Sequence, residues 1–117
     1  MRHEANSPNL FPCDRVPGDR ADRTLIGIYE QRQEDRMLQR IRIPGGRLDG
    51  RQWHCLAGIA RAHSPETPLH LTTRQDIEIH DLLPGQVPAV QRDIAAAGLT
   101  CFGAAGDTFR NIIVCPC

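Results

Sequence analysis

The spacing of apolar residues along this chain alternates between every second residue and every third or fourth, and this alternation constrains the fold. Residues 36–43 alternate apolar and polar side chains and stop at a Pro-Gly-Gly sequence, which predicts a strand. Asp49 and Gln52 have the spacing of a capping box, and the apolar positions after them recur at helical spacing. We therefore predict a helix from Asp49 to His63.

The second half of the chain repeats the pattern with a further strand. Two short alternating runs, 69–72 and 76–80, predict strands joined by a tight connection at 73–75. Apolar residues at helical spacing then predict a helix that Gly98 ends. The apolar segment 109–114 predicts a last strand. The order strand, helix, strand, strand, helix, strand predicts an α+β, ferredoxin-like fold with two helices on one face of an antiparallel sheet.

Length and composition limit the number of domains and the classes of function that the chain can have. The 117 residues suffice for one small domain, which we place at 25–117 after a flexible lead at 1–24 that lacks periodicity. The 14 basic and 14 acidic side chains cancel, which argues against a nucleic-acid binder that relies on bulk charge. We find no secretory signal and no membrane-spanning apolar run, and the five cysteines lack a disulfide-scaffold spacing. A cytoplasmic location, without a membrane partner, is the expectation.

Period two divides the strand residues between two faces. We expect one set beneath the helices: Ile41, Ile43, Leu69, Leu71, Ile77 and Ile79. The other set would lie on the open face and is strongly polar: Arg40, Arg42, His70, Thr72, Arg74, Asp76, Glu78, His80 and Arg110. Guanidinium groups on one face suit a bound oxyanion or carboxylate. The alternative is a solvated face on which Arg40 pairs with Asp76 or Glu78.

Cysteine and histidine give no metal site. Cys115 and Cys117 offer only two thiols one residue apart, and the five histidines show no ligand spacing. Neither a P-loop nor a dinucleotide-binding glycine motif is present, so the glycines of 103–106 indicate a loop.

Four strings in order suggest a family. Residues 27–32 (GIYEQR) and 37–46 (MLQRIRIPGG) resemble the opening of the sirohaem-dependent sulfite and nitrite reductases. The strings 71–80 (LTTRQDIEIH) and 106–111 (GDTFRN) continue the resemblance, which covers about residues 25–117. Precorrin-3B synthase has a similar half-domain and is a competing assignment.

The resemblance implies an oxidoreductase that reduces sulfite or nitrite on sirohaem coupled to a [4Fe–4S] cluster. In that family, the residues that match Arg40 and Arg110 contact the oxyanion substrate. Those that match Arg74, Gln75 and His80 line the sirohaem carboxylates, and Arg42 and Asn111 lie beside them. Fixed guanidiniums could hold both kinds of anion.

The chain departs from the family pattern in three ways. The cluster cysteines, spaced C-x5-C and C-x3-C, are absent, the chain contains no lysine, and only one of two half-domains is present. We therefore expect a fragment or subunit whose partners are the second half-domain, the cluster domain and an electron donor, either ferredoxin or a flavoprotein. The alternative is a stand-alone, non-catalytic half-domain that dimerises through its open sheet.

Overall fold

The computed structural model describes residues 13–33, 35–106 and 109–115. Its helices and strands, in chain order, are α2 (Arg20–Leu25), β1 (Ile28–Glu30), β2 (Met37–Ile41), the 3-10 turn η1 (Pro44–Gly46), α3 (Gly50–His63), β3 (His70–Leu71), β4 (Ile77–Leu82), the 3-10 turn η2 (Pro84–Gln86) and α4 (Val87–Ala96). In this part of the chain, no helix has the length and apolar character needed to cross a membrane.

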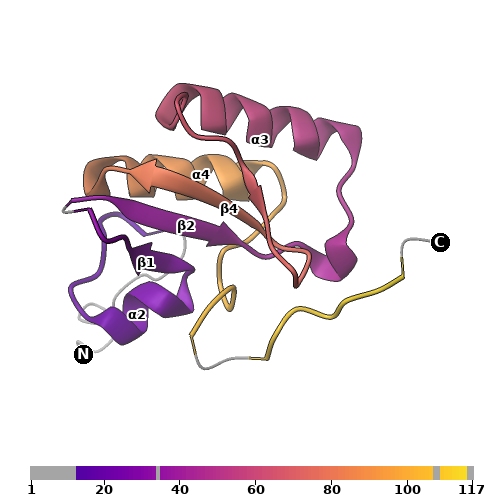
Figure 1. Ribbon diagram of the computed structural model, residues 1–117, viewed down its shortest axis with the longest axis horizontal. Helices are drawn as coiled ribbons and strands as arrows, with labels where there is room; N and C mark the ends of the chain where they lie inside the picture. Colours follow the sequence, from indigo (N-terminus) through magenta and orange to yellow (C-terminus); the bar gives the residue numbers. More distant parts are fainter. Residues whose placement is uncertain (1–12, 34, 107–108, 116–117) are drawn as a thin grey trace, which may run out of the picture.

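The four strands form one sheet in the order β1-β2-β4-β3, with every neighbouring pair antiparallel. Helices α3 and α4 lie together on one side of this sheet, and the segment that leads to the C-terminus passes on the other side (Figure 1). The predicted α+β arrangement, with both helices on one face, is confirmed. It leaves the opposite face for a binding site.

The first long helix begins as its sequence predicts. The Asp49 carboxylate accepts a hydrogen bond from the Gln52 backbone N–H at 2.7 Å, and the Gln52 side-chain oxygen accepts from the Asp49 N–H at 3.0 Å. This capping box satisfies backbone donors that the first turn of a helix leaves without partners. Helix α3 then buries Leu56 and Ile59 against the sheet.

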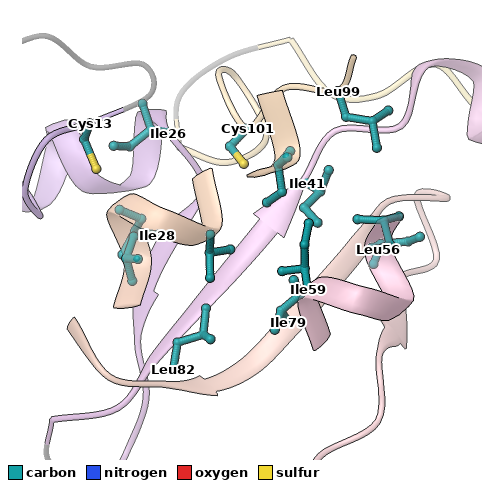
Figure 2. Close-up of a cluster of buried hydrophobic side chains, with 14 of the residues drawn as sticks. Cys13, Ile26, Ile28, Ile41, Leu56, Ile59, Ile79, Leu82, Leu99 and Cys101 are labelled. Atoms are coloured by element: carbon teal, nitrogen blue, oxygen red, sulfur yellow. The ribbon is translucent and has the colours of Figure 1, made fainter. Parts of the chain in front are cut away.

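The core lies between the sheet and α3 and α4, and isoleucine and leucine side chains fill most of it (Figure 2). Ile41, Ile43, Ile77 and Ile79 are buried as predicted, and Leu69 packs against the core from a partly exposed position. The prediction for Leu71 is wrong, since 71% of this residue is exposed. Strand β3 is only two residues long and lies at the sheet edge, where both of its residues are exposed.

The sequence before residue 25 contains regular structure that the pattern does not predict. Asp19 caps α2, because its carboxylate accepts a hydrogen bond from the Ala21 N–H at 2.9 Å. Cys13 is buried, and its backbone N–H donates to the side-chain oxygen of Gln91 on α4 at 3.0 Å. A six-residue helix is too short to show a periodic pattern, and for this reason sequence reasoning assigned this stretch to the flexible lead.

The predicted last strand is wrong. Residues 109–114 form no strand, and the fourth strand of the sheet is β1, where no strand was predicted. The β1 strand pairs with β2 along its outer edge, and Arg42 just beyond β2 pairs with Thr100. Because this edge already has partners, the segment 109–114 crosses the open side of the sheet instead.

Candidate functional site

A pocket of about 250 Å³ opens on the face of the sheet opposite α3 and α4. It gathers arginines from three places in the chain: Arg40 from β2, Arg74 from the turn between β3 and β4, and Arg110 from the segment after the glycine loop. The remaining lining residues are Tyr29, Thr72, Thr73, Asp76, Gly103, Ala104, Ala105, Gly106 and Asn111. Sequence reasoning expected these three arginines on one face, although Arg74 lies in a turn and Arg110 in a segment that is not a strand.

Arg40 is held in place on one side. Its Nε and Nη2 atoms lie 2.8 and 2.7 Å from one carboxylate oxygen of Glu78, which is directly opposite on β4. Its guanidinium carbon lies 5.0 Å from the centre of the Tyr29 ring, within the range of a cation–π contact. The face thus contains the Arg40–Glu78 ion pair of the solvated-face interpretation, but the same arginine also lines the pocket.

A buried amide network fixes the backbone beneath Arg40. The Gln39 side chain is fully buried, and its nitrogen donates to the carbonyl oxygens of Ile26 at 2.9 Å and Arg40 at 3.0 Å. The Gln91 amide nitrogen donates to the Gln39 side-chain oxygen at 2.9 Å, so both groups of the Gln39 amide have partners. The Arg40 N–H donates to the Gly27 carbonyl at 2.7 Å. Strand β2 is thereby tied to the turn before β1 and to α4.

Asn111 joins the other two arginines of the pocket. Its buried side-chain nitrogen donates to the carbonyl oxygens of Ile43 at 2.9 Å and Arg74 at 2.8 Å. This places Arg110, the preceding residue, at the same pocket as Arg74. Neither guanidinium forms an ion pair with a residue of the described ranges. Two of the pocket's three positive charges are therefore not neutralised by an ion pair within those ranges.

Arg42 and Gln75 do not line the pocket, although sequence reasoning placed them at the cofactor. Arg42 Nη1 donates to the carbonyl oxygens of Gly103 at 2.9 Å and Phe109 at 3.2 Å. The Gln75 amide donates to the Val114 carbonyl at 3.1 Å and accepts from its N–H at 3.2 Å. In this structure they hold the glycine loop and the last segment in place, and their contact with a cofactor stays a prediction.

His80 also lies outside the pocket lining. Its ring stacks on that of His70, with the ring centres 3.8 Å apart and the planes within 3°. Its Nε2 lies 3.0 Å from the Glu78 carboxylate oxygen that Arg40 does not contact. The histidine is thus connected to the pocket-lining Arg40 through Glu78, and its direct contact with a cofactor stays a prediction.

Two carboxylates on this face have pKa values displaced in opposite directions. Burial raises the pKa of Asp76, and the hydrogen bond from the Ile43 N–H and the charge of Arg40 offset this only in part. Burial also acts to raise the pKa of Glu78, but hydrogen bonds from His80 and Arg40 outweigh it and hold the pKa below its usual value. Glu78 is therefore the carboxylate that stays ionised over the wider pH range.

Sequence reasoning missed parts of the pocket wall. Tyr29 lines the pocket from β1, and the only signal for that strand is the short alternation after Gly27. The loop 103–106 was assigned no role, yet all four of its residues line the pocket. The described residues include no cluster of three or more His, Cys, Asp or Glu side chains that could hold a metal ion.

The fold and the pocket define an α+β domain that presents converging guanidinium groups on the open face of its sheet. Residues 29–97 match the family model of the nitrite/sulfite reductase ferredoxin-like half domain. Since the match spans more than half of the chain, this protein belongs to that family. The predicted family and the predicted ferredoxin-like fold are thus confirmed.

Individual relatives agree with the family match. The chain is 35% identical to the sulfite reductase [NADPH] hemoprotein beta-component of Acidithiobacillus ferrooxidans, over 74% of this chain and 18% of that protein. It is 31% identical to the assimilatory ferredoxin-dependent nitrite reductase of Haloferax mediterranei, over 88% of this chain and 20% of that protein. The chain thus spans about a fifth of the length of these relatives.

A solved structure resembles this fold. The structure of Mycobacterium tuberculosis NirA superposes with a TM-score of 0.75, covering 92% of this chain and 24% of that chain. At 22% sequence identity, this likeness concerns the fold alone.

Proposed function

We propose that this chain provides the cofactor- and substrate-binding half-domain of a sirohaem-dependent sulfite or nitrite reductase. The observation that carries the proposal is the convergence of Arg40, Arg74 and Arg110 on one pocket of about 250 Å³. Arginine forks match the two oxygens of a carboxylate or a small oxyanion. The volume of the pocket lies below the 300–1,000 Å³ typical of sites for drug-sized ligands. The pocket therefore suits a carboxylate or a small oxyanion rather than a whole macrocycle.

The residues present fit the anionic groups of sirohaem. Arg74 and Arg110 make no ion pair with the described residues, so both guanidiniums are available to a bound anion at the pocket. When bound, the cofactor would supply the iron that binds the substrate and would pass on to it the electrons that come from the donor. The family resemblance assigns the sirohaem carboxylates to Arg74, Gln75 and His80. It assigns the oxyanion to Arg40 and Arg110. Asn111 would hold the backbone of Arg74 through the bond described above.

Within this function, the guanidiniums orient the oxyanion and stabilise negative charge on its oxygens. They act from fixed positions, because Arg40 is paired with Glu78, and Arg110 directly precedes Asn111, which is anchored by two hydrogen bonds. Preorganised donors stabilise developing charge without reorganising during the reaction. The structure therefore supports electrostatic binding and positioning as the contribution of this chain.

The rest of the reaction would require further protein. The chain lacks the cluster-cysteine spacings, so the [4Fe–4S] ligands would come from the remainder of the reductase. The second half-domain and an electron donor, ferredoxin or a flavoprotein, complete the proposed assembly. One relative is named a ferredoxin-dependent nitrite reductase and another an NADPH sulfite reductase component, so the similar proteins differ in the source of electrons that their names give.

The proposal is tested by adding nitrite to the ¹⁵N-labelled chain and recording backbone amide spectra. We expect shifts centred on residues 40, 74, 110 and 111, and weaker binding in Arg110→Gln by about tenfold, the scale of one charge-assisted hydrogen bond. Arg61→Gln is the matched control, because Arg61 is exposed on α3 at the opposite face of the sheet. Shifts on α3, or equal weakening in both variants, would refute the assignment of the pocket.

A further inference from the structure

A row of three polar side chains crosses the open face. Glu78 on β4 is paired in register with Arg40 on β2 and with His70 on β3. One oxygen of the Glu78 carboxylate contacts both Nε and Nη2 of Arg40, and the other oxygen lies 3.0 Å from Nε2 of His80. Both carboxylate oxygens are therefore engaged, and only 12% of the Glu78 side chain is exposed.

These contacts restrict the Arg40 guanidinium to one orientation. The bonds to Glu78 occupy one edge of its plane, and the Tyr29 ring lies 5.0 Å from its carbon. Nη1 makes no hydrogen bond to a residue in the described ranges, and Arg40 lines the pocket. Fixing the rotatable bonds of an arginine side chain in advance removes part of the entropy cost of binding an anion.

From this geometry we propose that Glu78 is the positioning residue of the pocket, holding Arg40 so that Nη1 is the nitrogen presented to an anion. The inference rests on the proposed function, because it assumes that the pocket binds an oxyanion. His80 supports the arrangement by holding the second oxygen of Glu78, and His70 limits the movement of the His80 ring by stacking on it.

Charge alone makes the opposite prediction. A carboxylate beside an anion site repels the ligand, so removing Glu78 should strengthen anion binding if its only effect is electrostatic. If Glu78 positions Arg40, its removal should weaken binding, because the guanidinium then samples many orientations. The sign of the change in nitrite affinity therefore separates the two roles.

The test uses Glu78→Ala, Glu78→Gln and the control Glu30→Ala. Glu30 lies on β1 and pairs with Arg23 at 2.6 Å, but its side chain is 62% exposed and it does not line the pocket. Its removal takes away the same charge from the same sheet. Nitrite affinity is measured from amide shifts, and the rate at which the Arg40 Nε–H exchanges with water is measured without nitrite.

We expect Glu78→Ala to bind nitrite about tenfold more weakly and to speed Arg40 Nε–H exchange by about tenfold, the scale of one charge-assisted hydrogen bond. Glu78→Gln keeps the size and one acceptor oxygen, so it should restore part of both losses. If Glu78→Ala fails to fold, Glu78→Gln is compared with the unmodified chain in its place. Glu30→Ala should leave Arg40 exchange unchanged.

Tighter nitrite binding in both Glu78 variants, or unchanged Arg40 exchange, would overturn the positioning role. If the unmodified chain does not bind nitrite, the proposed function fails on that count. The exchange rates of Arg40 then still decide whether Glu78 fixes its orientation, so the two failures are distinguishable.

Discussion

Gly27→Ala tests the contact between the turn before β1 and the backbone of the pocket residue Arg40. Gly27 has a φ of +79°, a left-handed conformation in which alanine costs about 1 kcal/mol or more. A methyl group there would press against the Arg40 carbonyl oxygen and lie 2.8 Å from the Gln39 side-chain nitrogen. The Gln39 side-chain nitrogen donates a hydrogen bond to that Arg40 carbonyl oxygen, and the Gly27 carbonyl accepts one from the Arg40 N–H. Losing one buried hydrogen bond costs about 1–3 kcal/mol more.

We therefore expect Gly27→Ala to lower the free energy of unfolding by about 3 kcal/mol, a large part of the 5–15 kcal/mol typical of a small domain. Urea denaturation followed by far-ultraviolet circular dichroism measures the loss. The control is Gly58→Ala, because an added methyl at this exposed position in α3 meets nothing within 4 Å. That variant should gain about 0.5–1 kcal/mol. A Gly27→Ala variant within 0.5 kcal/mol of the unmodified chain would refute the reasoning.

Three further changes test other parts of the account. Asp49→Ala removes the cap of α3 and should cost about 1 kcal/mol in urea denaturation, and no loss would contradict the capping role. Gln91→Leu deprives the Cys13 N–H and the buried Gln39 amide of partners and should cost about 2–3 kcal/mol by the same assay, whereas a neutral result would show that the network adds nothing. Asp76→Asn tests a pH dependence: because burial raises the pKa of this carboxyl above its usual 3.8, the folded chain binds its proton more tightly than the unfolded chain does. The unmodified chain should therefore lose stability as pH rises through the pKa of Asp76 in the folded state. Asp76→Asn should be the more stable of the two at pH 7 but not at pH 3. An equal difference in the free energy of unfolding at both pH values would contradict the burial effect.

The elements with clear local signals could be predicted from the sequence. The capping box at Asp49 and the apolar spacing of α3 depend on contacts between residues close in the chain. Helix α4 likewise buries Val87, Val90 and Ile94 at the predicted spacing. Alternation in β2 and β4 also placed Arg40 on the open face, opposite to Ile41.

The errors arise where distant parts of the chain compete for one place. Residues 109–114 have the composition of a strand, but β1 and Thr100 already pair along the edge of β2. The polar Gln39 shares the inward parity of Ile41, and its hydrogen bonds to the Ile26 carbonyl and to Gln91 on α4 explain why it can be buried. No pattern within a single strand contains that information.

The site was predicted in its charges but not in its contacts. The period of β2 places Arg40 on the open face, and Arg74 and Arg110 reach the same pocket from a turn and from an irregular segment. Their partners depend on register and on turns. Arg42 thus shares the strand parity of Arg40, yet it bonds to the carbonyl of Gly103 in the glycine loop.

The most direct test of the central claim is a titration of the purified chain with sirohaem, followed by visible absorption. We expect saturable binding that Arg74→Gln weakens by about tenfold and that Arg61→Gln leaves unchanged, because Arg74 lines the pocket and Arg61 lies on α3 at the opposite face of the sheet. No binding, or equal affinity in Arg74→Gln and the unmodified chain, would contradict the claim that the arginines of the open face hold the cofactor.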